Sequence, residues 1–163
     1  MTDSSLNKLT SLIASHKSEG KRVVFTNGVF DILHVGHVTY LEAAKAKGDV
    51  LIVGVNDDAS VRRLNKGPER PINGEEARAK VISSLKSVDE VVIFGEDTPF
   101  ELIKVLRPNV LVKGGDYDPE ERDPTSKTYM VGSDLILAEK GEVAVIPLVK
   151  GFSTTSIVRK LKG

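Results

Sequence analysis

The stretch Arg-Val-Val-Phe-Thr-Asn-Gly-Val-Phe-Asp-Ile-Leu-His-Val-Gly-His at residues 22–37 decides the fold of this chain. Its early part, Val23–Thr26, is rich in β-branched and aromatic residues, which predicts a buried strand. Apolar residues at helical spacing from Val35 to Ala46 predict a helix soon after it. The turn between them exposes the first backbone N–H groups of that helix and its positive dipole end. An anion such as phosphate is therefore the ligand that this turn favours.

Two of the chain's three histidines, His34 and His37, lie at this turn. An imidazole can be cationic near neutral pH, so the pair adds hydrogen-bond donors for a phosphoryl group. Gly36 between them has no Cβ that would block a ligand approaching the backbone. The alternative is a structural role, in which His34 caps the turn and His37 packs on the helix. The motif together with its strand–turn–helix context favours the phosphate site.

The composition excludes several classes of protein. The chain has 163 residues, enough for one domain with a substantial core, and 23 basic side chains balance 23 acidic ones. Without a net basic charge we expect no nucleic-acid partner. Cysteine is absent, which excludes a disulfide framework and thiolate catalysis. Met1–Ser5 does not resemble a signal peptide, and no apolar run is long enough to span a membrane. We therefore expect a cytoplasmic protein without a membrane partner. The sequence also shows no set of metal ligands, so we expect no metal held by the protein.

Strands and helices alternate along the rest of the chain. We expect strands at Val23–Thr26, Val50–Val55, Glu90–Phe94, Val110–Lys113 and Val143–Pro147. We expect helices at Ser5–Lys17, 35–47, 75–86, 98–106 and 127–140, and a last helix after Ser153. This alternation predicts an α/β fold with a five-stranded parallel sheet covered on both faces, whose ligands bind at the carboxyl ends of the strands. We expect a single domain over residues 1–163, with residues 1–20 as an N-terminal helical extension.

Several separate motifs resemble one known group of enzymes. Asn27-Gly28-Val29-Phe30-Asp31 followed by His34-Val35-Gly36-His37 resembles the signature of the HxGH nucleotidyltransferase superfamily. Lys113-Gly114-Gly115-Asp116-Tyr117 and Gly151-Phe152-Ser153-Thr154-Thr155 are similar to one branch of it, the D-glycero-β-D-manno-heptose 1-phosphate adenylyltransferases of lipopolysaccharide precursor synthesis. The resemblance covers about residues 20–162 and implies a Rossmann-like three-layer sandwich.

The resemblance also implies roles for individual residues. The catalytic residues would be His34, His37 and Lys66, the last in the polar segment 56–74, where Arg62 and Arg63 compete with it. The nucleotide would be bound by Thr26, Asn27, Gly28, Val29, Phe30, Gly36, Arg78, Ser153, Thr154 and Thr155. The acceptor substrate would be bound by Asp31, Lys113, Gly114 and Asp116.

Some of these residues also have a purely structural interpretation. The charged residues of the segment 56–74 can form a solvated surface. Arg78 can brace neighbouring motifs or pair with Glu75 on its own helix. Ser153 or Thr154 is a good helix N-cap on local grounds alone, a role that is compatible with phosphate binding.

The implied reaction is the attack of a sugar 1-phosphate on the α-phosphorus of ATP, with pyrophosphate as the leaving group. Mg²⁺ would bridge phosphate oxygens and take few ligands from the protein. Residues 148–152 contain no arginine, whereas the related glycerol-3-phosphate cytidylyltransferases carry an Arg-Thr pair there, so Lys150 is the cation left at this position. Two alternatives stay open: a cytidylyl- or guanylyltransferase for another phosphorylated acceptor such as glycerol 3-phosphate, and a catalytically silent nucleotide-binding module.

The resemblance carries three further expectations. Relatives in the superfamily are commonly dimers, so we expect a homodimer, and the stripe of Leu6, Leu9, Leu12 and Ile13 can serve either an interface or the protein's own core. The branch is often fused to a sugar kinase, which we expect to be a separate protein here. Residues 118–127 are rich in charge and proline, and we expect them to be mobile or lid-like.

Overall fold

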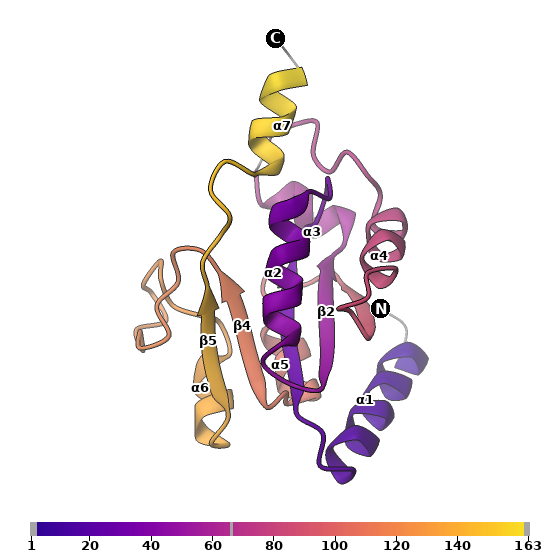
Figure 1. Cartoon of the computed structure of the whole chain (residues 1–163), viewed down its shortest axis with the longest axis vertical. Coiled ribbons are helices and arrows are strands. Elements are labelled where there is room, and N and C mark those ends of the chain that lie inside the picture. Colours follow the sequence, from indigo (N-terminus) through magenta and orange to yellow (C-terminus); the bar gives the residue numbers. More distant parts are fainter. Residues whose placement is uncertain (1–2, 66, 162–163) are drawn as a thin grey trace.

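A parallel sheet organises the computed structural model, which describes residues 3–65 and 67–161 (Figure 1). Its strands, in chain order, are β1 (Val23–Gly28), β2 (Val50–Asn56), β3 (Glu90–Phe94), β4 (Val110–Gly114) and β5 (Glu142–Ile146). They lie side by side in the order β3-β2-β1-β4-β5, so β1 is central. The sequence analysis predicted all five strands, and each differs from its expected bounds by no more than two residues at either end.

The central strands are apolar because both of their faces are covered. Every residue of β2 is buried, and β1 is buried over its first four residues. β1 pairs with β2 from Val23 opposite Val50 to Gly28 opposite Val55, and with β4 through Val24 opposite Val110. A parallel strand buried on both faces has a nearly continuous apolar sequence rather than an alternating one. The prediction of a buried strand at Val23–Thr26 is therefore confirmed.

Helices cover the two faces of the sheet. They are α1 (Asp3–Ser18), α2 (Val35–Lys45), α3 (Asp58–Arg63), α4 (Glu75–Ser83), α5 (Phe100–Leu106), α6 (Ser133–Ala138) and α7 (Thr154–Leu161). Side chains of α1, α5 and α6 share one core with the sheet, whereas those of α2 and α4 share the other. Figure 1 shows α2 in front of the sheet and α5 behind it. The arrangement is the expected three-layer sandwich.

The apolar stripe of α1 belongs to the protein's own core. Leu9 is 7% exposed and Ile13 is 3% exposed, and both pack with Leu102 and Leu106 of α5. Burying each of these side chains stabilises the fold by about 1.5–3 kcal/mol. Of the two roles considered for this stripe, the structure thus assigns these two residues to the core. Among the described helices, none is both long and apolar enough to cross a membrane.

One helix prediction was wrong in extent, and one helix was not predicted. The helix expected at 127–140 is confined to Ser133–Ala138, because Gly132 before it has a φ of +87°, in the left-handed region where a right-handed helix cannot continue. The sequence analysis predicted no helix within the polar segment 56–74, yet this segment contains α3. The Asp57 carboxylate accepts a hydrogen bond from the Ser60 backbone N–H at 2.6 Å and so caps this short helix.

Candidate active site

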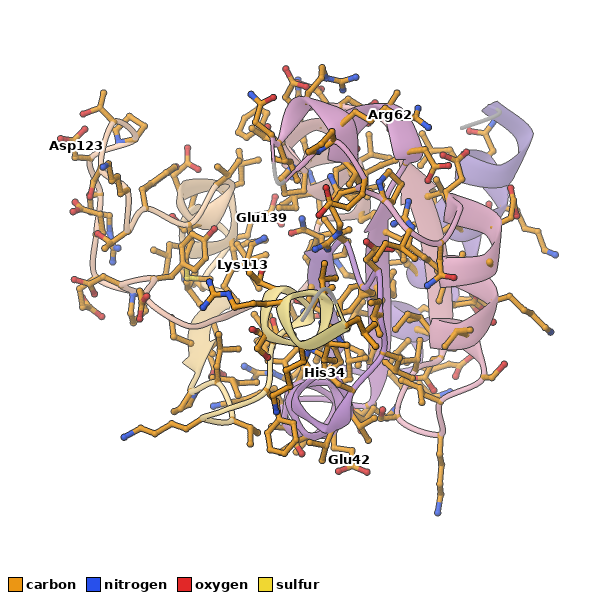
Figure 2. All side chains as sticks on the ribbon, turned by 90° about the horizontal axis from the view of Figure 1, so that it is seen from above. His34, Glu42, Arg62, Lys113, Asp123 and Glu139 are labelled. Atoms are coloured by element: carbon orange, nitrogen blue, oxygen red, sulfur yellow. The ribbon has the colours of Figure 1, made fainter. Side chains whose placement is uncertain are left out.

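The two motifs from opposite ends of the chain line one cavity of about 510 Å³ at the carboxyl end of β1. The residues lining it that the sequence analysis named are Asn27, Gly28, Val29, Phe30, Asp31, His34, Gly36, His37, Gly114, Ser153, Thr154 and Thr155. Figure 1 shows α7 beyond the upper end of α2, and Figure 2 shows His34 at that end of α2, close to α7. The His-Val-Gly-His segment and the Ser-Thr-Thr segment therefore face the same space.

The two histidine rings stack on each other. Their centroids are 3.9 Å apart and their planes are inclined by 19°. The ring of Phe30 meets His37 edge-on at 5.3 Å, which fixes the second imidazole from another side. The Nδ1 atom of His34 is buried and has no hydrogen-bond partner among the described residues. Buried polar atoms without partners are uncommon, and this one lies beside a cavity that is open to a ligand.

Burial favours the neutral form of both imidazoles. It lowers the pKa of His37 to about 4, with a further lowering from the nearby His34 and a partial recovery from a hydrogen bond to the backbone of Ile32. Burial also lowers the pKa of His34. Both shifts oppose the cationic form that the sequence analysis considered for these rings near neutral pH. A neutral imidazole still offers one N–H donor, and an anion beside it would raise its pKa again.

Helix N-termini point into this cavity from two sides. His34 is the N-cap residue of α2, but its side chain makes no capping hydrogen bond, which contradicts the structural alternative for this residue. Ser153 caps α7, because its hydroxyl accepts a hydrogen bond from the Ser156 backbone N–H at 3.0 Å. Each N-terminus carries unpaired N–H groups and a partial positive charge, so the two are suited to bind one anionic chain between them.

A second cavity of about 400 Å³ adjoins the first. The two share Asn27, Gly28 and Val29 as a common wall. Lys113 lines the second cavity, where its Nζ donates a hydrogen bond to the Asn27 side-chain oxygen at 2.5 Å and lies 5.7 Å from the centre of the Tyr117 ring. Gly114 lines the first cavity instead. Asp116 is exposed and lines neither cavity, so its predicted role in substrate binding stays a prediction.

Three predicted ligand-binding residues, Thr26, Arg78 and Asp31, form hydrogen bonds with other protein groups next to the cavity. Thr26 is fully buried, and its hydroxyl lies 2.6 Å from the Tyr40 hydroxyl. Arg78 is 1% exposed and donates hydrogen bonds to the carbonyl oxygens of Val29 and Asn73 and to the Asp58 carboxylate, at 2.7–2.8 Å. This geometry matches the bracing role considered for Arg78, because it ties the loop after β1 to α3 and the start of α4.

Asp31 likewise faces the protein rather than the solvent. Its carboxylate accepts hydrogen bonds from the backbone N–H groups of Ile72 and Asn73 at 2.9–3.0 Å and from Arg70. Burial favours the neutral acid, but the Asn73 and Ile72 N–H groups and the Arg70 guanidinium outweigh it and hold the pKa of Asp31 below its usual value. The predicted contact of Asp31 with substrate stays a prediction, and the structure gives it a second role as an anchor for residues 70–73.

The segment 56–74 contributes a residue that sequence reasoning did not single out. Arg70 lines the first cavity and is only 7% exposed. The predicted catalytic Lys66 lies outside the described residues. Arg63, considered as a competitor, bonds to Asp97 and to the Gly95 carbonyl, away from the histidines. Nothing in the sequence distinguished Arg70 from the other arginines of this segment, because its burial depends on a distant partner, Asp31.

Metal ligands are not part of the site as the structure describes it. Over residues 3–65 and 67–161, no group of three or more His, Cys, Asp or Glu side chains could hold a metal ion. The site is thus built from imidazoles, hydroxyls, backbone N–H groups and basic side chains. All of these can donate hydrogen bonds to phosphate oxygens.

A parallel α/β sheet with a His-x-Gly-His turn after its central strand, facing a hydroxyl-rich helix N-terminus, defines a nucleotidyltransferase-type domain. Comparison with known proteins gives the family. Residues 25–160 match the cytidylyltransferase-like family, so the chain belongs to that family.

Individual relatives agree with this assignment. The chain is 51% identical over 157 residues to the bifunctional protein HldE of Geotalea uraniireducens, an alignment that covers 96% of this chain and 30% of that protein. It is 57% identical over 147 residues to the bifunctional protein HldE of Nitratiruptor sp., covering 90% and 29% of the two chains. The chain thus spans about 30% of the length of these curated relatives. The crystal structure of the lipopolysaccharide core biosynthesis protein from Thermoplasma volcanium superposes with a TM-score of 0.61 at 30% identity, covering 82% of this chain and all of that one.

Proposed function

We propose that this domain transfers AMP from ATP to a heptose 1-phosphate, giving ADP-heptose and pyrophosphate for lipopolysaccharide or surface-glycan precursor synthesis. The single observation that carries the proposal is the cavity in which His34 and His37 face Ser153–Thr155 across the end of β1. The high identity to HldE proteins over nearly the whole chain supports it, as does the similarity to a lipopolysaccharide core biosynthesis protein.

The nucleotide triphosphate would occupy the cavity of about 510 Å³. Its phosphates would lie between the N-termini of α2 and α7, where backbone N–H groups and the Ser153–Thr155 hydroxyls can donate to them. His34 and His37 would donate to the α-phosphate and to the oxygen that joins it to the leaving pyrophosphate. The acceptor phosphate attacks the α-phosphorus in line, so the protein supplies positioning and charge stabilisation rather than a nucleophile.

The sugar phosphate would occupy the adjoining cavity of about 400 Å³. Lys113 and Asn27 stand where this cavity meets the first, so they can hold the attacking phosphate next to the nucleotide. By the family resemblance, Lys66 would also approach the phosphates. Asn27, Gly28 and Val29 separate the two substrates and fix the distance between them.

Mg²⁺ fits this site as a companion of the nucleotide rather than as a ligand of the protein. The described residues offer no three-residue metal cluster, and Mg²⁺ commonly binds through substrate phosphates and water. When bound, it would neutralise phosphate charge. The chain's own contribution is the set of N–H and hydroxyl donors around those phosphates.

The test is pyrophosphate release from a matrix of nucleotides and acceptors. ATP, CTP and GTP are each combined with heptose 1-phosphate and with glycerol 3-phosphate, in the presence of Mg²⁺. We expect turnover with ATP and heptose 1-phosphate. Turnover with CTP or GTP, or with glycerol 3-phosphate alone, would replace the proposal by the corresponding cytidylyl- or guanylyltransferase. No turnover with any pair, together with nucleotide binding, would indicate a catalytically silent module.

The assembly state and location complete the proposal. We propose a homodimer in the cytoplasm, where ATP is available, on the ground of the family resemblance. Sedimentation equilibrium of the purified chain tests the first part. A concentration-independent monomer mass would contradict the homodimer without affecting the proposed reaction.

A further inference from the structure

Arg70 is a buried arginine that pairs with the Asp31 carboxylate through its Nε atom. Its Nε donates a hydrogen bond to an Asp31 carboxylate oxygen, and the side chains of the pair are 7% and 0% exposed. The same carboxylate also accepts from the backbone of Ile72 and Asn73. Asp31 is therefore fully occupied, and it fixes the orientation of the guanidinium plane.

The hydrogen bond to Asp31 uses only the Nε–H group of Arg70, so the Nη1 and Nη2 groups, which form the fork of the guanidinium, are available to a ligand. Across residues 3–65 and 67–161, no group accepts a hydrogen bond from the Nη1 or Nη2 of Arg70. Neither Nη1 nor Nη2 belongs to the fully buried side-chain atoms without a partner among the described residues, so both atoms keep accessible surface and can donate hydrogen bonds to a ligand. Arg70 lines the cavity that contains His34, His37 and the Ser153–Thr155 hydroxyls. Its unpaired donors thus border a space where a ligand can take them up.

The chemistry of this fork selects the ligand. Two parallel N–H groups of a guanidinium match two oxygens of one phosphate group, a geometry that a lysine ammonium cannot reproduce. The ion pair with Asp31 offsets much of the positive charge. The gain therefore comes from two directed donors in a cavity of low dielectric, rather than from general attraction. Arg70 does not line the second cavity, where the acceptor is proposed to bind.

We propose that Arg70 binds the polyphosphate tail of the nucleotide through Nη1 and Nη2, with Asp31 as the residue that positions it. The inference rests on the proposed function, since it assigns the phosphates of that nucleotide to a specific side chain. Arg70 would hold the part that leaves as pyrophosphate, next to the N-terminus of α7.

The experiment measures binding without catalysis. Inorganic tripolyphosphate and AMP are titrated calorimetrically into the wild-type protein and into the variants Arg70→Lys and Arg70→Gln. In Arg70→Lys the ammonium keeps the ion pair with Asp31 but has no fork for a phosphate. We expect tripolyphosphate affinity to fall about ten- to hundredfold in both variants, as befits lost charge-assisted hydrogen bonds, and AMP affinity to change far less.

Arg22→Gln is the matched control. Arg22 also pairs with a carboxylate, Glu142 at 2.5 Å, but it lies at the amino end of β1, whereas the cavity lies at the carboxyl end of that strand. We expect this variant to bind both ligands as the wild type does. Thermal melting reports whether each variant is folded, and Arg70→Lys decides the question if Arg70→Gln does not fold.

The outcomes separate this inference from the proposed function. Unchanged tripolyphosphate affinity in Arg70→Lys, equal losses for tripolyphosphate and AMP, or no tripolyphosphate binding by the wild type would each overturn the role of Arg70. A selective loss supports that role even if the wild type releases no pyrophosphate from ATP and heptose 1-phosphate. In that case the proposed reaction fails and the polyphosphate site stands.

Discussion

Replacing Gly36 by alanine tests the catalytic geometry with a single methyl group. A Cβ at this position would lie 3.0 Å from both Cε1 and Nδ1 of the His34 ring and 3.4 Å from Cβ of Phe152. These contacts are tighter than ordinary carbon contacts of about 3.5–4.0 Å, so the ring has to move by a few tenths of an ångström. The stacked ring of His37, 3.9 Å away, restricts where it can go.

The expected effect falls on turnover rather than on stability. A misplacement of about 1 Å can cost about a hundredfold in rate, so for a shift of a few tenths of an ångström we expect kcat/KM to fall by up to about tenfold. Alanine in place of a helical glycine stabilises a protein by about 0.4–1 kcal/mol, which offsets part of the strain from the displaced ring. We therefore expect Tm to change by no more than about 4 °C.

The assay is pyrophosphate release under saturating ATP, with thermal melting in parallel. Gly74→Ala is the matched control, because a Cβ there would meet nothing closer than the Asp58 carboxylate at 3.6 Å. If Gly36→Ala keeps wild-type kcat/KM while remaining folded, the position of the His34 ring does not matter for the reaction. The assignment of His34 as a donor to the reacting phosphate would then be refuted.

Three other predictions follow from the same site. His34→Ala or His37→Ala should lower kcat about 10²- to 10³-fold with little change in Tm, as for other donors to a developing charge, and steady-state kinetics would show it. Arg78→Ala should destabilise the fold by about 2–4 kcal/mol, since the Val29 and Asn73 carbonyls and the half-buried Asp58 carboxylate lose their donor, and denaturant unfolding measures this. The folded-state pKa of His37, about 4, lies below its unfolded value, so the unfolded chain binds more protons between pH 6.5 and 4. The free energy of unfolding should accordingly fall as pH drops through that window, and His37→Gln should flatten the slope.

The sequence predicted secondary structure correctly where the local apolar pattern corresponds to the burial of the element. The apolar segments at 23–26 and 50–55 predict buried strands correctly, because a parallel strand that is covered on both faces has a nearly continuous apolar sequence. The histidines of α2 and the hydroxyls before α7 followed from motif and topology together. A single left-handed glycine, Gly132, was enough to shorten a helix that the apolar pattern had predicted to be longer.

The rest of the site depends on contacts that no local pattern records. Arg70 is distinguished from Arg62 and Arg63 only by its pairing with Asp31, which lies far from it in the chain. The low pKa of His37 arises from the packing of Phe30 and His34 around it, and a histidine motif alone does not reveal that burial. The inward orientation of Arg78 likewise requires three acceptors from separate segments.

The wall that Asn27, Gly28 and Val29 form between the two cavities has a consequence for inhibitor design. If the two cavities bind the nucleotide and the sugar phosphate as proposed, a compound that joins analogues of both needs only a short linker to pass the last two residues of β1 and the residue after them. Once the first half is seated, the second half binds at a high effective concentration, so the affinities of two weak fragments can be combined. Because Asn27 and Gly28 belong to β1, the central strand of the sheet, the span of such a linker is set by the scaffold and not by loop motion.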